Sequence, residues 1–240
     1  MGDIAIHLAD WGPRLFEAAI LTLVLTAASF SGAFALGLIL EAMRTSRCAG
    51  LRHVVGCYIW VLRAVPLLIV LYLLYFVLPD LGITLSPLLT GTIGLVLVHG
   101  AYMAEIFRAG MQAIEQGQWE AARALGLTRL LCLRLVAIPQ AIRHMFGPLI
   151  VAAISVLKDS SVCALIGVNE LTLTSRAIMS ETFMPLHVFL LAGLFYLALG
   201  WPASMLARAV ERRMNVRSAV RHTTRFRASK AQACLASLAR

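Results

Sequence analysis

The chain has 240 residues, of which 60% are hydrophobic and only 14% are charged. Soluble domains are closer to half apolar and a quarter charged, so this composition argues against a water-soluble enzyme and against extended disorder. Lysine and arginine exceed aspartate and glutamate by 21 to 12, and nearly all of the excess follows Ala207. We interpret the basic tail as a cytoplasmic anchor beside anionic lipid, not as a nucleic-acid-binding segment.

Cysteine and histidine spacing gives no sign of a metal centre. The five cysteines contain no Cys-x-x-Cys pair, and the six histidines are scattered without a paired spacing. The sequence therefore predicts neither a disulfide framework nor a metal site.

Long apolar runs predict an all-α integral membrane protein with five transmembrane helices and short cytoplasmic helices. The second helix is expected to begin near Pro66, with the preceding stretch along the inner membrane face and Arg63 extending to that side. The fourth run either ends as a short helix at Lys158 or crosses with Lys158 and Asp159 part-way along it. The predicted spans are residues 18–40, 64–79, 82–104, 145–168 and 182–207, within a membrane domain of residues 1–214 that precedes a basic cytoplasmic tail of residues 215–240.

Loop charge predicts the orientation of these spans. Arginines are concentrated in residues 41–53, 105–144 and the tail, whereas the alternate loops carry few basic residues. Because basic loops stay in the cytoplasm, the N-terminus is expected outside and the C-terminus inside.

The long loop of residues 105–144 predicts an elbow of two short helices. Trp119 to Leu125 is rich in helix formers, and Gly126 follows where a helix C-terminus would be capped. Thr128 is placed to cap a second short helix, which Pro139 is expected to close. Such an elbow is suited to docking into a groove on another protein, and the alternative is a plain amphipathic connector.

This elbow resembles the EAA motif of membrane subunits of ATP-binding-cassette importers. Glu120-Ala-Ala, then Gly126, then Val136-Ala-Ile-Pro139 has that motif's spacing. Further stretches are similar to the polar amino-acid branch of the family, the histidine and glutamine permeases. They are Ala101-Tyr-Met-Ala-Glu-Ile-Phe-Arg-Ala-Gly110, Arg63-Ala-Val-Pro-Leu-Leu68, Lys158-Asp-Ser-Ser161 and Ile166-Gly-Val-Asn-Glu-Leu171. Ala64, Val65 and Ser160 depart from the family pattern.

The resemblance implies a non-enzymatic permease subunit that moves polar amino acids across the bacterial inner membrane. It also implies a second permease chain, two ATPase subunits that use ATP, and an extracytoplasmic amino-acid-binding protein as partners. No cofactor is expected in this chain, which has no Gly-x-x-x-x-Gly-Lys-[Ser/Thr] element for nucleotide phosphates. The alternative is a self-sufficient secondary transporter or channel, which predicts internal repeats and more spans. The amino acid carried, and whether the permease pair is homodimeric or heterodimeric, stay open.

Two groups of residues are candidates for function. The resemblance assigns the first to ATPase coupling, with Glu120 pairing with an arginine of the partner or, alternatively, only stabilising its own helix. The second would line the substrate pathway, because ionisable groups beside a span are costly unless they face a pathway or each other. The candidates are Glu120, Ala121, Ala122 and Gly126 for coupling, and Lys158, Asp159, Ser160, Ser161 and His99 for the pathway.

In the pathway group, Asp159 would receive the substrate ammonium and Lys158 its carboxylate, and the alternative is an ion pair that only orients the helix. His99 is expected to be a neutral, packed histidine with a carbonyl partner unless it lines the pathway. Outside both groups, Glu170 is expected in an outer loop, available to the binding protein. Glu105 and Arg108 are expected to pair locally, since they lie three residues apart on one helix.

Overall fold

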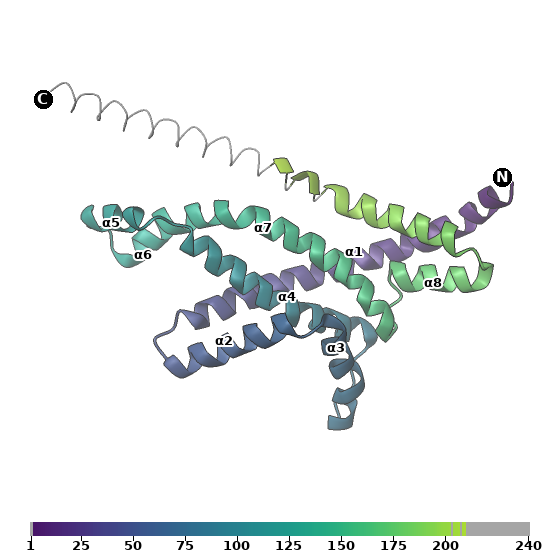
Figure 1. Cartoon of the computed structure of the whole chain (residues 1–240), viewed down its shortest axis with the longest axis horizontal. Coiled ribbons are helices and arrows are strands. Elements are labelled where there is room, and N and C mark those ends of the chain that lie inside the picture. Colours follow the sequence, from purple (N-terminus) through teal and green to yellow (C-terminus); the bar gives the residue numbers. More distant parts are fainter. Residues whose placement is uncertain (1, 203, 207, 210–240) are drawn as a thin grey trace, which may run out of the picture.

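The computed structural model describes residues 2–202, 204–206 and 208–209, with side chains from residue 10 onward. These residues form helices without β-strands, arranged in an elongated bundle whose short helices project at one end (Figure 1). The predicted tail of residues 215–240 lies outside the described residues. The elements are α1 (Gly2–Arg44), α2 (Ala49–Ala64), α3 (Leu67–Tyr72), α4 (Pro87–Gln112), α5 (Gln116–Ala124), α6 (Arg129–Cys132), α7 (Ile138–Asp159), α8 (Leu171–Thr182) and a last helix, Pro185–Leu206.

Four helical stretches are long and apolar enough to cross a membrane. A fifth crossing is present if α2 and the segment Leu67–Leu81 together form one broken span. The all-α membrane fold is therefore confirmed, with four or five candidate spans. The four continuous stretches are Asp10–Arg44, Pro87–Gln112, Arg129–Ile166 and Pro185–Leu206.

The helix before Pro66, α2, is packed differently from the prediction. α2 does not lie apart along a membrane face but packs lengthwise against α1 and α4, burying Val55 and Ile59 between them (Figure 1). The chain then bends by 107° at Val65 and Pro66, so α3 is the segment that turns aside. Proline disfavours helical geometry in the residue before it, which places the break at Val65.

α1 and α4 form the centre of the bundle through small residues. A Cβ atom on Gly37 would lie 2.5 Å from the Cβ of Met103 and 3.0 Å from the backbone nitrogen of Ala104. A larger side chain at position 37 would therefore push the two helices apart. Such close approach of helix backbones at small residues is typical of membrane helices.

The ends of α4 and α7 also differ from the expected limits. α4 begins at Pro87, because Ser86 accepts a hydrogen bond from the Leu89 nitrogen as its N-cap and proline fits the first turn. Pro139 does not close the second elbow helix. A π-helical turn, Leu133–Ala137, precedes Pro139, in which the Ile138 N–H bonds five residues back to Leu133. This wider turn lets a proline without an N–H enter a continuous helical stretch, Arg129–Ile166.

Candidate coupling elbow and polar pathway

The elbow projects beyond the bundle between α4 and the stretch that begins at α6 (Figure 1). α5 ends in a pair of backbone hydrogen bonds, from Gly126 to the Arg123 carbonyl and from Leu127 to the Ala122 carbonyl. This capping pattern requires a left-handed residue, and Gly126 supplies it with φ of +74°. Thr128 then caps α6 by accepting from the Leu131 nitrogen, so the two short helices and their glycine joint are as predicted.

The coupling candidates do not all face outward. Glu120 and Ala121 are exposed on α5, whereas Ala122 is buried against the rest of the chain. Trp119 packs on the core, and the Gln140 amide donates to the Gln118 side chain, which ties α5 to α7. The free face of α5 therefore presents Glu120 and Ala121, and Ala122 serves close packing within the chain.

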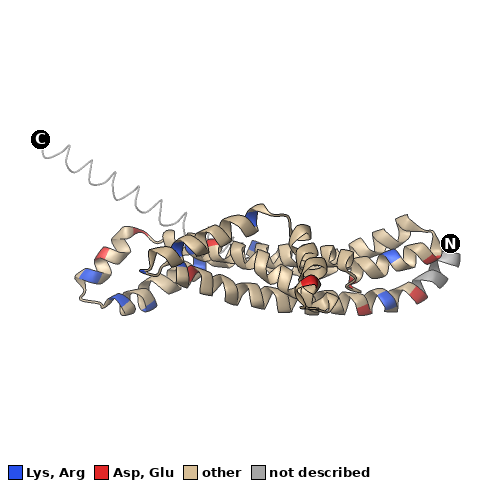
Figure 2. Ribbon diagram, turned by 90° about the horizontal axis from the view of Figure 1, so that it is seen from below, with Lys and Arg blue, Asp and Glu red and all other residues tan. Residues whose placement is uncertain are grey.

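Sequence reasoning missed two apolar side chains on the elbow. Leu125 is 80% exposed and Leu130 is 73% exposed, on either side of the Gly126 turn. Both leucines lie outside the long apolar runs, and those runs were the signal used to find apolar segments in the sequence. Positions of basic and acidic residues also lie along the ribbon at this end of the molecule, so the elbow combines apolar and charged residues (Figure 2).

The pathway candidates lie where α7 gives way to a 3₁₀ turn, Ser160–Ile166. The helical path therefore continues past Lys158 and Asp159, as in the second of the two predicted arrangements. The hydroxyls of Ser160 and Ser161 donate to the carbonyls of Leu157 and Lys158, so their protons are used within the helix.

Asp159 and His99 are brought together from different helices. His99 is 4% exposed, and its Nε2 lies 3.1 Å from Oδ2 of Asp159, without the alignment of a hydrogen bond. The predicted carbonyl partner of His99 is thus replaced by a carboxylate. Lys158 is exposed and forms no ion pair with Asp159 within the described part of the chain.

Glu105 joins three helices at the elbow end of the bundle. Its carboxylate accepts from Arg108 at 2.5 Å, which confirms the expected local pair, and from Arg44 of α1 at 2.5 Å. Arg63 of α2 approaches it to 4.0 Å and also lies over the ring of Tyr102. The side chain of Glu105 is 18% exposed, so these arginines compensate a largely buried charge.

Glu170 is not available to a binding protein, contrary to the expectation. It is fully buried, and its carboxylate accepts from the Thr172 and Leu173 nitrogens and from the Tyr196 hydroxyl. It is the N-cap of α8, and burial raises its pKa. Glu170 was placed in a loop because α8, the helix that it caps, was not predicted.

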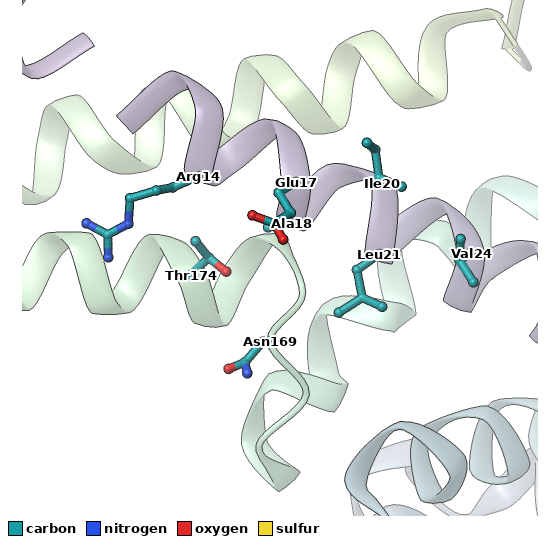
Figure 3. A pocket seen from close by; sticks show the side chains of 8 residues that line it. All are labelled: Arg14, Glu17, Ala18, Ile20, Leu21, Val24, Asn169 and Thr174. Carbon is teal, nitrogen blue, oxygen red and sulfur yellow. The ribbon is translucent and has the colours of Figure 1, made fainter. Parts of the chain in front are cut away.

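An open groove of about 510 Å³ lies on the N-terminal half of α1, at the end opposite the elbow. Figure 3 shows Glu17 of α1 extending toward α8 and Asn169. Arg14 beside it is held by Glu181 at the far end of α8, through two hydrogen bonds of 2.7 and 2.9 Å. That bond lowers the pKa of Glu181.

The comparisons with known proteins agree with this architecture. The family described as "Binding-protein-dependent transport system inner membrane component" matches residues 33–216. The chain belongs to this family. It is therefore a membrane-spanning permease subunit of a transport system, and a self-sufficient secondary transporter or channel is not favoured.

Individual relatives cover most of this permease. It is 34% identical to the glutamine transport system permease protein GlnP of Escherichia coli K12, over 86% of this chain and 98% of that one. It is also 34% identical to a probable amino-acid ABC transporter permease protein, YckA of Bacillus subtilis, over 80% and 85% of the two chains. A solved structure, described as an amino acid ABC transporter with histidines, matches with a TM-score of 0.82 and 33% identity over 87% of this chain and 97% of that one.

Proposed function

We propose that this permease carries polar amino acids across the inner membrane, driven by ATP hydrolysis on a separate subunit. The observation that carries the proposal is the elbow, which projects from one end of the bundle and exposes Glu120, Leu125 and Leu130. The sequence has no phosphate-binding element of its own, and its relatives are named as amino-acid and glutamine permeases. A second permease chain, two ATPase subunits and an extracytoplasmic binding protein complete the proposed assembly.

The elbow is the proposed contact with the ATPase. Glu120 offers a carboxylate, Ala121 permits close approach, and Leu125 and Leu130 offer apolar area that water disfavours. Gly126 fixes the angle between the two short helices. An apolar centre with a charged rim is the usual composition of a specific protein interface.

The proposed orientation places the elbow in the cytoplasm and the N-terminus outside. α1 and α4 both run toward the elbow end, while α2 and α7 run away from it (Figure 1). Arginine-rich loops cluster at the elbow end, in agreement with the distribution of basic residues across bacterial membranes.

Asp159 and Lys158 are proposed to face the pathway, with Ser160, Ser161 and His99 around them. A partly exposed carboxylate between two long apolar helices suits the ammonium group of an amino acid. Lys158, exposed and unpaired with Asp159, suits the substrate carboxylate.

Two substitutions test this function separately. Glu120→Lys should abolish co-purification of the ATPase and abolish uptake while the protein still inserts, with a loss of roughly 2–5 kcal/mol for a broken interfacial charge pair. Asp159→Asn should reduce uptake but leave assembly and basal ATP hydrolysis intact. Normal uptake and ATPase retention in Glu120→Lys would refute the docking role. Normal uptake in Asp159→Asn would refute the pathway role alone.

A further inference from the structure

The contact between His99 and Asp159 joins a buried imidazole to a partly exposed carboxylate. A buried imidazole nitrogen normally has a hydrogen-bond partner, yet Nε2 of His99 has none that is aligned. It points at a carboxylate 3.1 Å away whose side chain is still 45% exposed. One oxygen of Asp159 is thus directed toward the protein, while the group as a whole stays accessible.

The two residues come from the helices on either side of the elbow. His99 lies in α4, which leads into the elbow, and Asp159 ends α7, the helix that leaves it. Nearby polar groups are otherwise engaged. The Tyr102 ring lies 6.1 Å from the His99 ring and carries Arg63 above it, and Arg63 in turn extends toward Glu105. Among these neighbours, His99 is therefore the group placed to orient Asp159.

We propose that His99 is a positioning residue, which holds the Asp159 carboxylate so that it binds the ammonium group of the transported amino acid. Nε2 of His99 faces Oδ2 at 3.1 Å, and the exposed part of the carboxylate receives the ammonium. Burial fixes the ring, so the carboxylate is preorganised before the substrate arrives. The substrate class is amino acids with a free α-ammonium group, and this inference rests on the proposed function.

Binding to the permease itself tests the inference. The permease–ATPase complex, purified without binding protein, is titrated with tritiated L-glutamine, L-histidine and L-arginine, and the tightest probe is used thereafter. His99→Leu should raise its dissociation constant at least tenfold, whereas His99→Gln, which keeps an N–H donor, should stay within about threefold of wild type. N-acetylated forms of the probe should not compete. Tyr102→Phe, one turn away on α4, is the matched control and should bind as wild type.

A double-substitution cycle separates positioning from general damage. In the Asp159→Asn background, His99→Leu should cause no further loss, because its effect passes through the carboxylate. Equal binding by wild type and His99→Leu, or independent effects of the two substitutions, would overturn the inference. If His99→Leu does not insert, His99→Asn, too short to reach Asp159, gives the same comparison. If the wild type imports amino acids but the variants bind as the wild type does, the role of His99 is refuted and the proposed function stands. If the wild type imports no amino acid, the proposed function and the role of His99 are both refuted.

Discussion

At the scale of single residues, the polar groups of the bundle are organised by contacts between helices. The sequence predicts the Glu105–Arg108 pair, because i,i+3 spacing is visible in one dimension. The sequence does not predict the contact of Arg44 with the same carboxylate, because Arg44 lies 61 positions earlier in the chain. The same limit applies to Arg14 with Glu181, and to His99 with Asp159, whose proximity follows from helix packing alone.

Glu105→Gln should destabilise the permease by about 2 kcal/mol, between the values typical of exposed and buried ion pairs. The substitution removes the charge of the carboxylate that accepts hydrogen bonds from Arg44 and Arg108 in a largely buried site. Thermal unfolding of the purified protein in detergent measures the change. Asp80→Asn, at an exposed position, is the control and should leave the unfolding temperature unaltered. An equal response of the two variants would contradict a structural role for Glu105.

Docking of α8 on α1 should weaken in acid through Glu181. Its pKa is lowered by the hydrogen bond from Arg14, so the folded state favours the carboxylate. The stabilisation is complete above the ordinary glutamate pKa and is lost as pH falls through the lowered value. Hydrogen exchange of α8, corrected for intrinsic rates, should therefore show protection falling in acid.

Glu181→Gln supplies the control for this pH dependence. In this variant, α8 should be less protected from hydrogen exchange than in the wild type at pH 6. The difference in protection between the two proteins should disappear as the pH is lowered. Because Glu170 titrates in both proteins, only the difference between them reports on Glu181. Identical protection at pH 6 would show that the Arg14 contact does not hold α8.

At the scale of elements, the elbow is the part that the sequence describes best. Gly126 and Thr128 are local signals, and local signals fix caps and turns without help from tertiary contacts. The interpretation of Pro139 was wrong because a π-helical turn accommodates the missing N–H. The bend at Val65 was predicted, but the packing of α2 beside α1 and α4 was not, since it depends on which faces meet.

Gly126→Ala should weaken ATPase association while Gly117→Ala should not. Neither added methyl group would meet an atom within 4 Å, so only backbone conformation distinguishes the sites. A left-handed alanine at 126 costs roughly 1–2 kcal/mol, whereas Gly117 lies in helical α5. Co-purified ATPase per permease measures the effect. Gly126→Asn should retain more ATPase than Gly126→Ala, because asparagine tolerates this conformation, and the reverse order would contradict the conformational argument.

At the scale of the whole molecule, apolar runs were sufficient to predict an all-α membrane protein, because the bilayer demands length and hydrophobicity from each span. They could not place the limits of the spans, since helices extend past the apolar run at both ends. Thus α1 runs from Gly2 to Arg44, and α4 continues eight residues beyond the predicted limit at 104, to Gln112. α8 was not predicted because it is short and partly polar.

Reporter fusions should place Asp80 and Arg134 on opposite sides of the membrane. The bent pair before Asp80 carries the chain away from the elbow end, and α4 brings it back before Arg134. A reporter that is active only outside should work after Asp80, and one active only in the cytoplasm should work after Arg134. The same compartment for both would contradict five crossings with the N-terminus outside.

Uptake into vesicles tests whether this chain imports amino acids with energy taken from ATP on another subunit. The permease, its ATPase and its binding protein are reconstituted, and labelled amino acid is supplied with either ATP or a non-hydrolysable analogue on the ATPase side. We expect accumulation with ATP but not with the analogue, and loss of accumulation in Glu120→Lys. Accumulation without hydrolysis, or driven by an ion gradient in the absence of the ATPase, would contradict an ATP-driven permease.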